Sequence, residues 1–182
     1  MVASSLEKSQ QILYSVNGDF MDLRTQTVCF TGHREIKHEK CANILYGVVD
    51  NLINRGYRFF GAGGARGFDS YAAKVVLELK REKYPHIHLI LVLPFDNQYE
   101  AESGWSRQEI EDYHYYKQQA SKVVYIGDKY ERGIYYKRNR HLVDFSSVCI
   151  AYQYKNTGGT AYTTNYANKK GVQVINILQG GK

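Results

Sequence analysis

Residues 57–76 read YRFFGAGGARGFDSYAAKVV, so that a short apolar run, a glycine-rich loop and a helical pattern follow one another directly. The apolar run over residues 57–60 predicts a strand, which the glycines after it bring to an end. Apolar residues then recur at helical spacing over residues 68–82, which predicts a helix. A strand, a tight loop and a helix in this order form the repeating unit of α/β folds.

The same alternation extends to both sides of this stretch. Residues 28–30 predict a short strand that ends at Thr31-Gly32, and a helix is predicted over residues 44–53. Further strands are predicted at residues 87–93, 122–126, 148–151 and 172–177, and further helices at 106–119, at about 133–145 and before Gly171. The sequence therefore predicts an α/β, Rossmann-like, doubly wound fold, with a mainly parallel sheet of about six strands and helices on both faces.

Length and composition set the outer limits. The 182 residues suit one domain, and we expect an N-terminal arm at 1–24, with an Asn17-Gly18 turn signal, before a single domain at 25–182. The sequence lacks a membrane-spanning run and a signal-peptide pattern, so a cytoplasmic protein without a membrane partner is expected. Three cysteines without CxxC spacing, Cys29, Cys41 and Cys149, are expected to be reduced structural thiols.

The charge balance favours anionic partners. The net charge is +6, which attracts nucleic acids and small phosphate esters alike. The chain also has 17 tyrosines, many beside Lys or Arg. Such tyrosines can stack on bases or pack at the edge of the core, and the sequence leaves both readings open.

Unusual residues gather in the loops that follow the predicted strands. Crossover connections place all of these loops at one edge of a parallel sheet, where ligands of open α/β folds bind. Glycines there let backbone N–H groups approach an anion, and a helix N-terminus adds partial positive charge. We expect a phosphate ligand to bind to these residues: Gly32, His33, Arg34, Gly63, Gly64, Ala65, Arg66, Gly67, Phe68, Asp69, Pro94, Phe95, Arg138, Asn139, Gly158, Gly159 and Thr160.

Several of these residues have a second interpretation. The arginines at 34, 66, 138 and 140 could clamp phosphates, whereas residues 137–140 could equally form a solvated basic helix face. Asp69 could hold a ribose hydroxyl or an arginine, or cap the helix that begins beside it. The glycine-rich loop could be a tight turn without a ligand, although such a turn does not need four such residues together.

Several established motifs are absent from the sequence. The dinucleotide fingerprint would need a glycine where Arg66 stands, and Pro94 follows the next strand in place of an acidic residue. No Gly-Lys-Ser/Thr follows the glycines, which argues against an ATPase. His86 and His88 lie at the start of a predicted strand, away from the glycine loops, so no metal site and no cofactor are expected.

The loops resemble the SLOG superfamily of Rossmann-like proteins and, within it, the YpsA-like group once labelled DUF1273. The resemblance runs from about Val28 to Ile177. Its most specific motifs are Arg138-Asn139-Arg140-x-x-Val143-Asp144, Gly158-Gly159-Thr160-Ala161-Tyr162 and Tyr166-Ala167. The order and spacing of Thr31-Gly32-His33-Arg34, Gly63-Gly64-Ala65-Arg66-Gly67-x-Asp69, Pro94-Phe95 and Trp105 are also similar to that group.

This resemblance implies a pocket for a nucleotide or a nucleotide-derived signal, such as an ADP-ribose-like molecule or a cyclic nucleotide. The chain would then act as a sensor or a sequestering protein, as a homo-oligomer, with Phe68, Phe95 or Trp105 as a wall for the base. A first alternative is a nucleoside-monophosphate N-glycosidase or phosphoribohydrolase. The cytokinin-activating relatives carry a glutamate where this chain has Thr163, so no catalytic residue is assigned, and Glu35 or Asp69 would have to substitute. A second alternative is single-stranded nucleic-acid binding, because the DNA-processing protein DprA resembles this superfamily.

Overall fold

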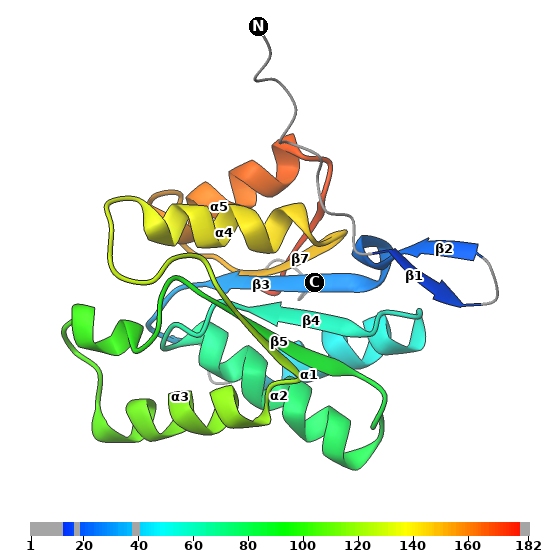
Figure 1. Ribbon diagram of the computed structural model, residues 1–182, viewed down its shortest axis with the longest axis horizontal. Helices are drawn as coiled ribbons and strands as arrows, with labels where there is room; N and C mark the ends of the chain where they lie inside the picture. The colour runs from blue at the N-terminus through cyan, green and yellow to red at the C-terminus, as the bar shows by residue number, and fades with distance from the viewer. Residues whose placement is uncertain (1–12, 17–18, 38–40, 179–182) are drawn as a thin grey trace, which may run out of the picture.

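The computed structural model describes residues 13–16, 19–37 and 41–178 (Figure 1). Six parallel strands form one sheet in the order β6-β5-β4-β3-β7-β8. The strands are β3 (Thr27–Gly32), β4 (Phe59–Ala62), β5 (His88–Leu93), β6 (Lys122–Tyr125), β7 (Val148–Tyr152) and β8 (Gln173–Asn176). The helices are α1 (Cys41–Asn54), α2 (Phe68–Glu82), α3 (Arg107–Gln119), α4 (Ile134–Asp144) and α5 (Gly158–Lys169), with 3-10 turns η1 (Leu23–Gln26) and η2 (Gln98–Ala101). The predicted Rossmann-like fold with a sheet of about six strands is confirmed.

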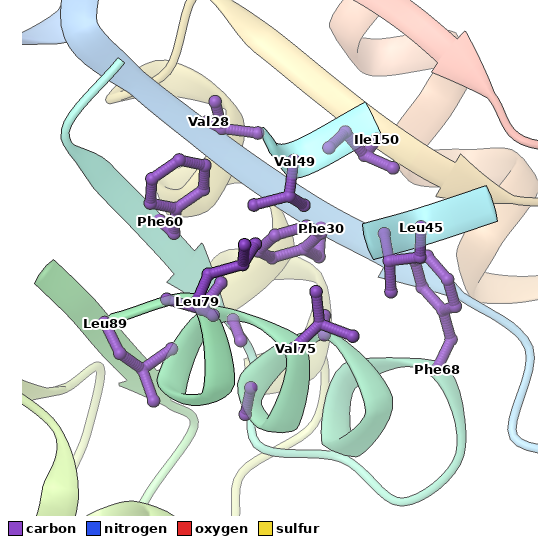
Figure 2. Close-up of a cluster of buried hydrophobic side chains, with 14 of the residues drawn as sticks. Val28, Phe30, Leu45, Val49, Phe60, Phe68, Val75, Leu79, Leu89 and Ile150 are labelled. Carbon is purple, nitrogen blue, oxygen red and sulfur yellow. The ribbon is translucent and has the colours of Figure 1, made fainter. Parts of the chain in front are cut away.

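Helices cover both faces of the sheet (Figure 1). Helices α1, α2 and α3 pack on one face, and α4 and α5 pack side by side on the other. The alternation of side chains along β3 serves both layers, since Val28 and Phe30 enter the core under α1 and α2 whereas Cys29 enters the core under α4 and α5. Figure 2 shows the first of these cores, in which Val28 and Phe30 lie among side chains that include Val49 and Leu79.

The segment predicted as an N-terminal arm contains two short strands. Strands β1 (Leu13–Val16) and β2 (Asp19–Asp22) pair antiparallel and are separate from the main sheet. The Asn17-Gly18 turn signal lies outside the described residues. The three cysteines are free and buried. Within the described ranges, no helix combines the length and apolarity needed to cross a membrane.

The fourth strand begins two residues later than the sequence pattern indicates. The backbone N–H of Tyr57 donates to the carbonyl of Leu52 at 3.1 Å and so belongs to the turn that ends α1. The preceding Gly56 has a φ of 101°, which reverses the chain there. Strand β4 therefore starts at Phe59 and extends through Gly61 to Ala62.

The strand order reverses at the centre of the sheet. After β6 at one edge, the chain crosses through α4 and returns as β7 beside β3. The loop after β3 then leads to a helix on one face, and the loop after β7 leads to α5 on the other. The loops after β3 and β7 thus diverge to opposite faces of the sheet, and ligands of such sheets commonly bind at this point.

Gly32 at the end of β3 shows how closely this edge is packed. A Cβ on Gly32 would lie 2.5 Å from the Cβ and ring atoms of Phe68, whose side chain is fully buried between Phe30 and Tyr152. We predict that Gly32→Ala lowers the free energy of unfolding by about 1–3 kcal/mol because the core cannot absorb the methyl group.

The matched control is Gly47→Ala in α1, where nothing lies within 4 Å of the added Cβ. This substitution is expected to stabilise the protein by about 0.5–1 kcal/mol, since alanine favours a helix more than glycine does. Urea denaturation measures both changes. Equal effects of the two substitutions would contradict the packing argument.

Candidate functional site

A buried ion pair lies at the centre of the carboxyl edge. Asp69, in the first turn of α2, accepts a hydrogen bond from the backbone N–H of Gly63 at 3.1 Å. Arg138, on α4, donates from Nη1 to the carbonyl of Gly63 and lies 3.9 Å from the carboxylate of Asp69. The side chains of Asp69 and Arg138 are 9% and 8% exposed. Together they join helices from opposite faces of the sheet through one loop residue.

Burial shifts the pKa of both residues of this pair. Loss of solvation raises the pKa of Asp69, against the opposing effects of Arg138 and of the N–H groups of Ala65 and Gly63. Loss of solvation lowers the pKa of Arg138, which Asp69 opposes. Asn139 adds an acceptor for Arg138, because its Oδ1 receives the Nε–H at 2.7 Å. Arg138 is thus held by its neighbours and is not free to clamp a phosphate, contrary to the prediction for this side chain.

Steric contacts explain why glycines occupy several positions of the loop. A Cβ on Gly63 would lie 2.0 Å from Nη1 of Arg138, and Gly67, with a φ of 80°, has the carbonyl oxygen of Arg34 2.2 Å from its Cβ position. Gly64 has a φ of 67°, and its carbonyl accepts from Nε2 of Gln98 at 2.6 Å. The loop therefore fits closely against both neighbouring loops. Packing accounts for these glycines without a ligand.

Arg66 is the unpaired cation of the loop. Its Nε atom is buried and has no hydrogen-bond partner, and no hydrogen bond or ion pair holds its guanidinium within the described part of the chain. The guanidinium lies against Gly104, 3.2 Å from that residue's Cβ position. A buried donor without an acceptor is rare in a folded protein and costs free energy. The arrangement therefore suits an anion supplied from outside.

A nearly buried carboxylate pairs with the second arginine of the site. Arg34 Nη2 lies 2.8 Å from Oε2 of Glu102, whose side chain is only 9% exposed whereas that of Arg34 is 50% exposed. The indole N–H of Trp105 donates to the same oxygen at 3.4 Å. The hydroxyl of Tyr135 is buried and has no hydrogen-bond partner among the described residues, and burial together with the charge of Glu102 raises the pKa of Tyr135. Sequence reasoning missed Glu102, because it follows a strand by nine residues and belongs to no motif.

Aromatic and basic side chains gather on the loops that follow β3 and β7. The rings of His33 and Tyr154 lie 4.1 Å apart, and the amines of Lys37 and Lys155 lie 5.0 and 5.6 Å from the centre of the Tyr154 ring. The backbone N–H of Lys155 donates to Nε2 of His33 at 3.3 Å. Burial lowers the pKa of His33, and the charges of Lys155 and Lys37 lower it further. The two lysines therefore give these loops positive charge that opposes protonation of His33.

The loop after β7 leads into α5. Gly158 and Gly159 are exposed, Thr160 is buried, and the side chain of Thr157 makes no capping hydrogen bond. The hydroxyl of Thr163 donates to the carbonyl of Gly159 at 2.8 Å, within the helix. The first N–H groups of a helix have no intrahelical acceptor, so an exposed helix start of this kind suits an anion.

The aromatic residues predicted as a wall for a base are placed differently. Phe68 is fully buried in the core, so its ring does not face a ligand, and this part of the prediction is wrong. Phe95 is buried against Tyr130 and Tyr135 beside the likewise buried Pro94. Trp105 packs on Tyr99 and Tyr113 and is partly exposed.

Two further polar side chains, Arg140 and Asp69, bind to groups of the protein itself. Arg140 donates to the hydroxyl of Tyr162 at 2.9 Å on the surface of α4 and α5. Asp69 binds the loop at Gly63 and does not cap α2, whose N-cap is Gly67. No group of three or more His, Cys, Asp and Glu side chains is arranged for a metal ion in the residues that the structure covers.

Two solved structures share the fold. DNA processing protein A (DprA) of Streptococcus pneumoniae superposes with a TM-score of 0.62 at 18% identity, over 84% of this chain and 50% of that one. DprA of Helicobacter pylori, solved in a study of its single-stranded DNA binding mode, gives a TM-score of 0.61 at 19% identity, over 84% of this chain and 65% of that one. At this identity the likeness establishes the fold alone.

Three sequence relatives come from Brevibacillus and Bacillus species, and one of them is prophage-derived. A UPF0398 protein of Brevibacillus brevis is 32% identical over 113 residues, which cover 59% of this chain and 56% of that protein. A UPF0398 protein of Bacillus thuringiensis is 31% identical over 66% of this chain and 65% of its own length. The SPbeta prophage-derived protein YoqJ of Bacillus subtilis is 31% identical over 144 residues, 71% of this chain and 81% of YoqJ. The matches thus span less than two thirds of both UPF0398 proteins.

The family itself is defined by a match over most of the chain. The sequence model named YpsA, described as the YspA SLOG family, matches residues 24–177. That range contains every strand of the parallel sheet and all the loops of its carboxyl edge. The chain therefore belongs to the YpsA family of SLOG proteins.

Proposed function

We propose that this chain binds a phosphate-bearing nucleotide or nucleotide-derived signal at the carboxyl edge of its sheet, as a sensor or sequestering protein. The observation that carries the proposal is the unpaired guanidinium of Arg66, with its Nε removed from water. Arg138 and Arg34 at the same edge both have carboxylate partners. A phosphate oxygen would supply the missing acceptor through a charge-assisted hydrogen bond.

The neighbouring loops after β3 and β7 support a ligand larger than phosphate. They offer the aromatic pair His33 and Tyr154, the amines of Lys37 and Lys155, and the exposed start of α5. Aromatic faces and cations together suit a base or sugar with a further phosphate. The ligand-binding role of Gly158, Gly159 and Thr160 is part of this proposal.

The carboxylates at the edge favour binding over turnover. Asp69 is buried and accepts a hydrogen bond from the N–H of Gly63, and Glu102 pairs with Arg34. Glu35 lies 3.6 Å from the amine of Lys37, and the hydroxyl of Thr163 is bound within its helix. A glycosidase would need a carboxylate free to meet a reacting atom or a water. We therefore place nucleotide hydrolysis below binding.

Single-stranded DNA is the second candidate. The fold likeness to Helicobacter pylori DprA, a protein with a single-stranded DNA binding mode, supports it, together with the net charge of +6 and the exposed rings of Tyr130 and Tyr136. A DNA strand would track a basic surface and stack its bases on such rings. The two candidates share phosphate chemistry and differ in the length of the ligand.

We predict that Arg66→Gln lowers the affinity for a bound nucleotide about 10- to 100-fold, the loss expected for a charge-assisted hydrogen bond. A thermal-shift screen with mononucleotides, NAD, ADP-ribose and cyclic di- and trinucleotides provides the measurement. At 100 times its dissociation constant a ligand adds about 2.7 kcal/mol, which raises the melting temperature of the wild-type protein by about 5–10 °C.

The charge-matched control is Arg140→Gln, because Arg140 donates to Tyr162 on the outer surface of α4 and α5. It should keep the ligand-induced shift. A shift that survives in Arg66→Gln, or that disappears equally in both variants, would remove Arg66 from the site.

Salt dependence separates the two candidates. Binding of a thymidine oligonucleotide by several phosphate contacts should weaken steeply with salt, with a slope near −0.7 per contact, as each contact releases counterions. A mononucleotide held by one or two contacts should weaken far less. Titration at two salt concentrations with both ligands makes the comparison. Tighter and more salt-sensitive binding of the oligonucleotide would favour DNA as the ligand.

A further prediction concerns the ion pair that supports the loop. Asp69→Asn keeps an acceptor for the Gly63 N–H but removes the charge opposite buried Arg138, so the free energy of unfolding should fall by about 3 kcal/mol or more. Urea denaturation measures the change. Glu111→Gln, which breaks an exposed pair with Arg107 on α3, should leave stability nearly unchanged. Equal stability of Asp69→Asn and the wild type would refute the structural role of the pair.

A further inference from the structure

One segment contacts two arginines of the site. Residues 94–106 connect β5 to α3 through the short turn η2. Gly104 of this segment lies against the guanidinium of Arg66, and Glu102 lies 2.8 Å from Nη2 of Arg34. Trp105 packs on Tyr99 of the same segment and on Tyr113 of α3. The guanidinium groups of Arg34 and Arg66 therefore both have this segment as a neighbour.

We propose that Glu102 is a built-in competitor for the anion site, whose carboxylate occupies Arg34 until a phosphate displaces it. This inference rests on the proposed function, because it assumes that an anion binds at this edge. A carboxylate and a phosphate present similar oxygen pairs to a guanidinium, so one can replace the other on the same donors. The phosphate affinity of the wild-type protein then depends on the replacement of Glu102 at Arg34, and not on the contact with Arg34 alone.

The burial of the two partners supports an exchange. Glu102 is 9% exposed, and its carboxylate has the guanidinium of Arg34 and the indole N–H of Trp105 as partners. A carboxylate removed from water is stable there only while such partners remain. Arg34 is half exposed, so an incoming phosphate can reach it from solvent. Once Arg34 turns to the phosphate, Glu102 loses its cation and moves toward water.

The backbone around Glu102 is suited to such a movement. Residues 102–106 follow the η2 turn and precede α3 without regular secondary structure. Gly104 has a φ of 85°, a conformation that a glycine leaves and re-enters without a steric penalty. The N–H of Glu102 donates to the carbonyl of Tyr99 at a long 3.4 Å. Displacement of Glu102 therefore breaks few backbone hydrogen bonds.

Trp105 gives the chain a reporter for this exchange. It is the single tryptophan of the sequence, and its indole N–H donates to Oε2 of Glu102. The NMR spectrum therefore has one indole N–H signal, from Trp105, and its position depends directly on where the Glu102 carboxylate lies. Saturating inorganic phosphate should move this signal toward its position in the Glu102→Gln variant.

The test compares Glu102→Gln with Glu100→Gln in titrations with inorganic phosphate and with adenosine 5′-monophosphate at constant ionic strength. Glu100 is exposed and lies on the same segment, so the two variants carry the same change in net charge. We expect Glu102→Gln to bind both probes about three- to tenfold more tightly, because Arg34 no longer has to release a carboxylate. Glu100→Gln should bind as the wild type does. In an Arg34→Gln background, Glu102→Gln should have no further effect.

The outcomes separate this inference from the proposed function. Equal affinities of wild type and Glu102→Gln, with binding still lost in Arg66→Gln, overturn the competitor and leave the anion site. Binding to Glu102→Gln but not to the wild type supports the competitor. Failure of both proteins to bind either probe overturns the anion site and the competitor with it. If Glu102→Gln does not fold, an indole signal that stays fixed while phosphate saturates the wild-type protein overturns the proposal.

Discussion

The carboxyl edge of the sheet depends on the contact of Asp69, Gly63 and Arg138. Asp69 comes from α2 on one face of the sheet, Arg138 comes from α4 on the other, and both hydrogen bond to the backbone of Gly63 between them. Two buried charges need each other and the loop to remain out of water. This requirement fixes the path of the glycine-rich loop, and hence the direction in which Arg66 leaves it.

Much of the fold follows from the sequence because its signals are local. Continuous apolar runs such as residues 89–93 belong to strands covered on both faces, and the helical spacing after the glycines belongs to α2. The sequence pattern begins this strand at Tyr57, because aromatic residues are typical of strands. In the structure the N–H of Tyr57 completes the turn after α1, and β4 starts later. Strands β1 and β2 were not predicted, and they pair with each other in a sheet of their own.

The site was harder to predict, because its residues act through contacts between distant segments. The glycines were correctly located at the edge, but Gly63 and Gly67 are explained by the close approach of Arg138 and of the Arg34 backbone. Phe68 was assigned to a ligand wall and is instead a core residue, because helix α2 turns its first side chain toward Phe30. Glu102 carried no sequence signal at all, since its importance arises only when the chain between β5 and α3 folds back onto Arg34.

The three arginines of the edge differ in how fully their charge is used, and this difference orders their roles. Arg138 is buried with a carboxylate and a carbonyl and serves the fold. Arg34 is half exposed and neutralised by Glu102, so its charge becomes available only by exchange. Arg66 has no partner in the described chain and lies beneath Gly104. On the proposed function, an anion at this edge would gain most from Arg66 and least from Arg138, so that ligand recognition and fold stability would depend on different guanidinium groups of one sheet edge.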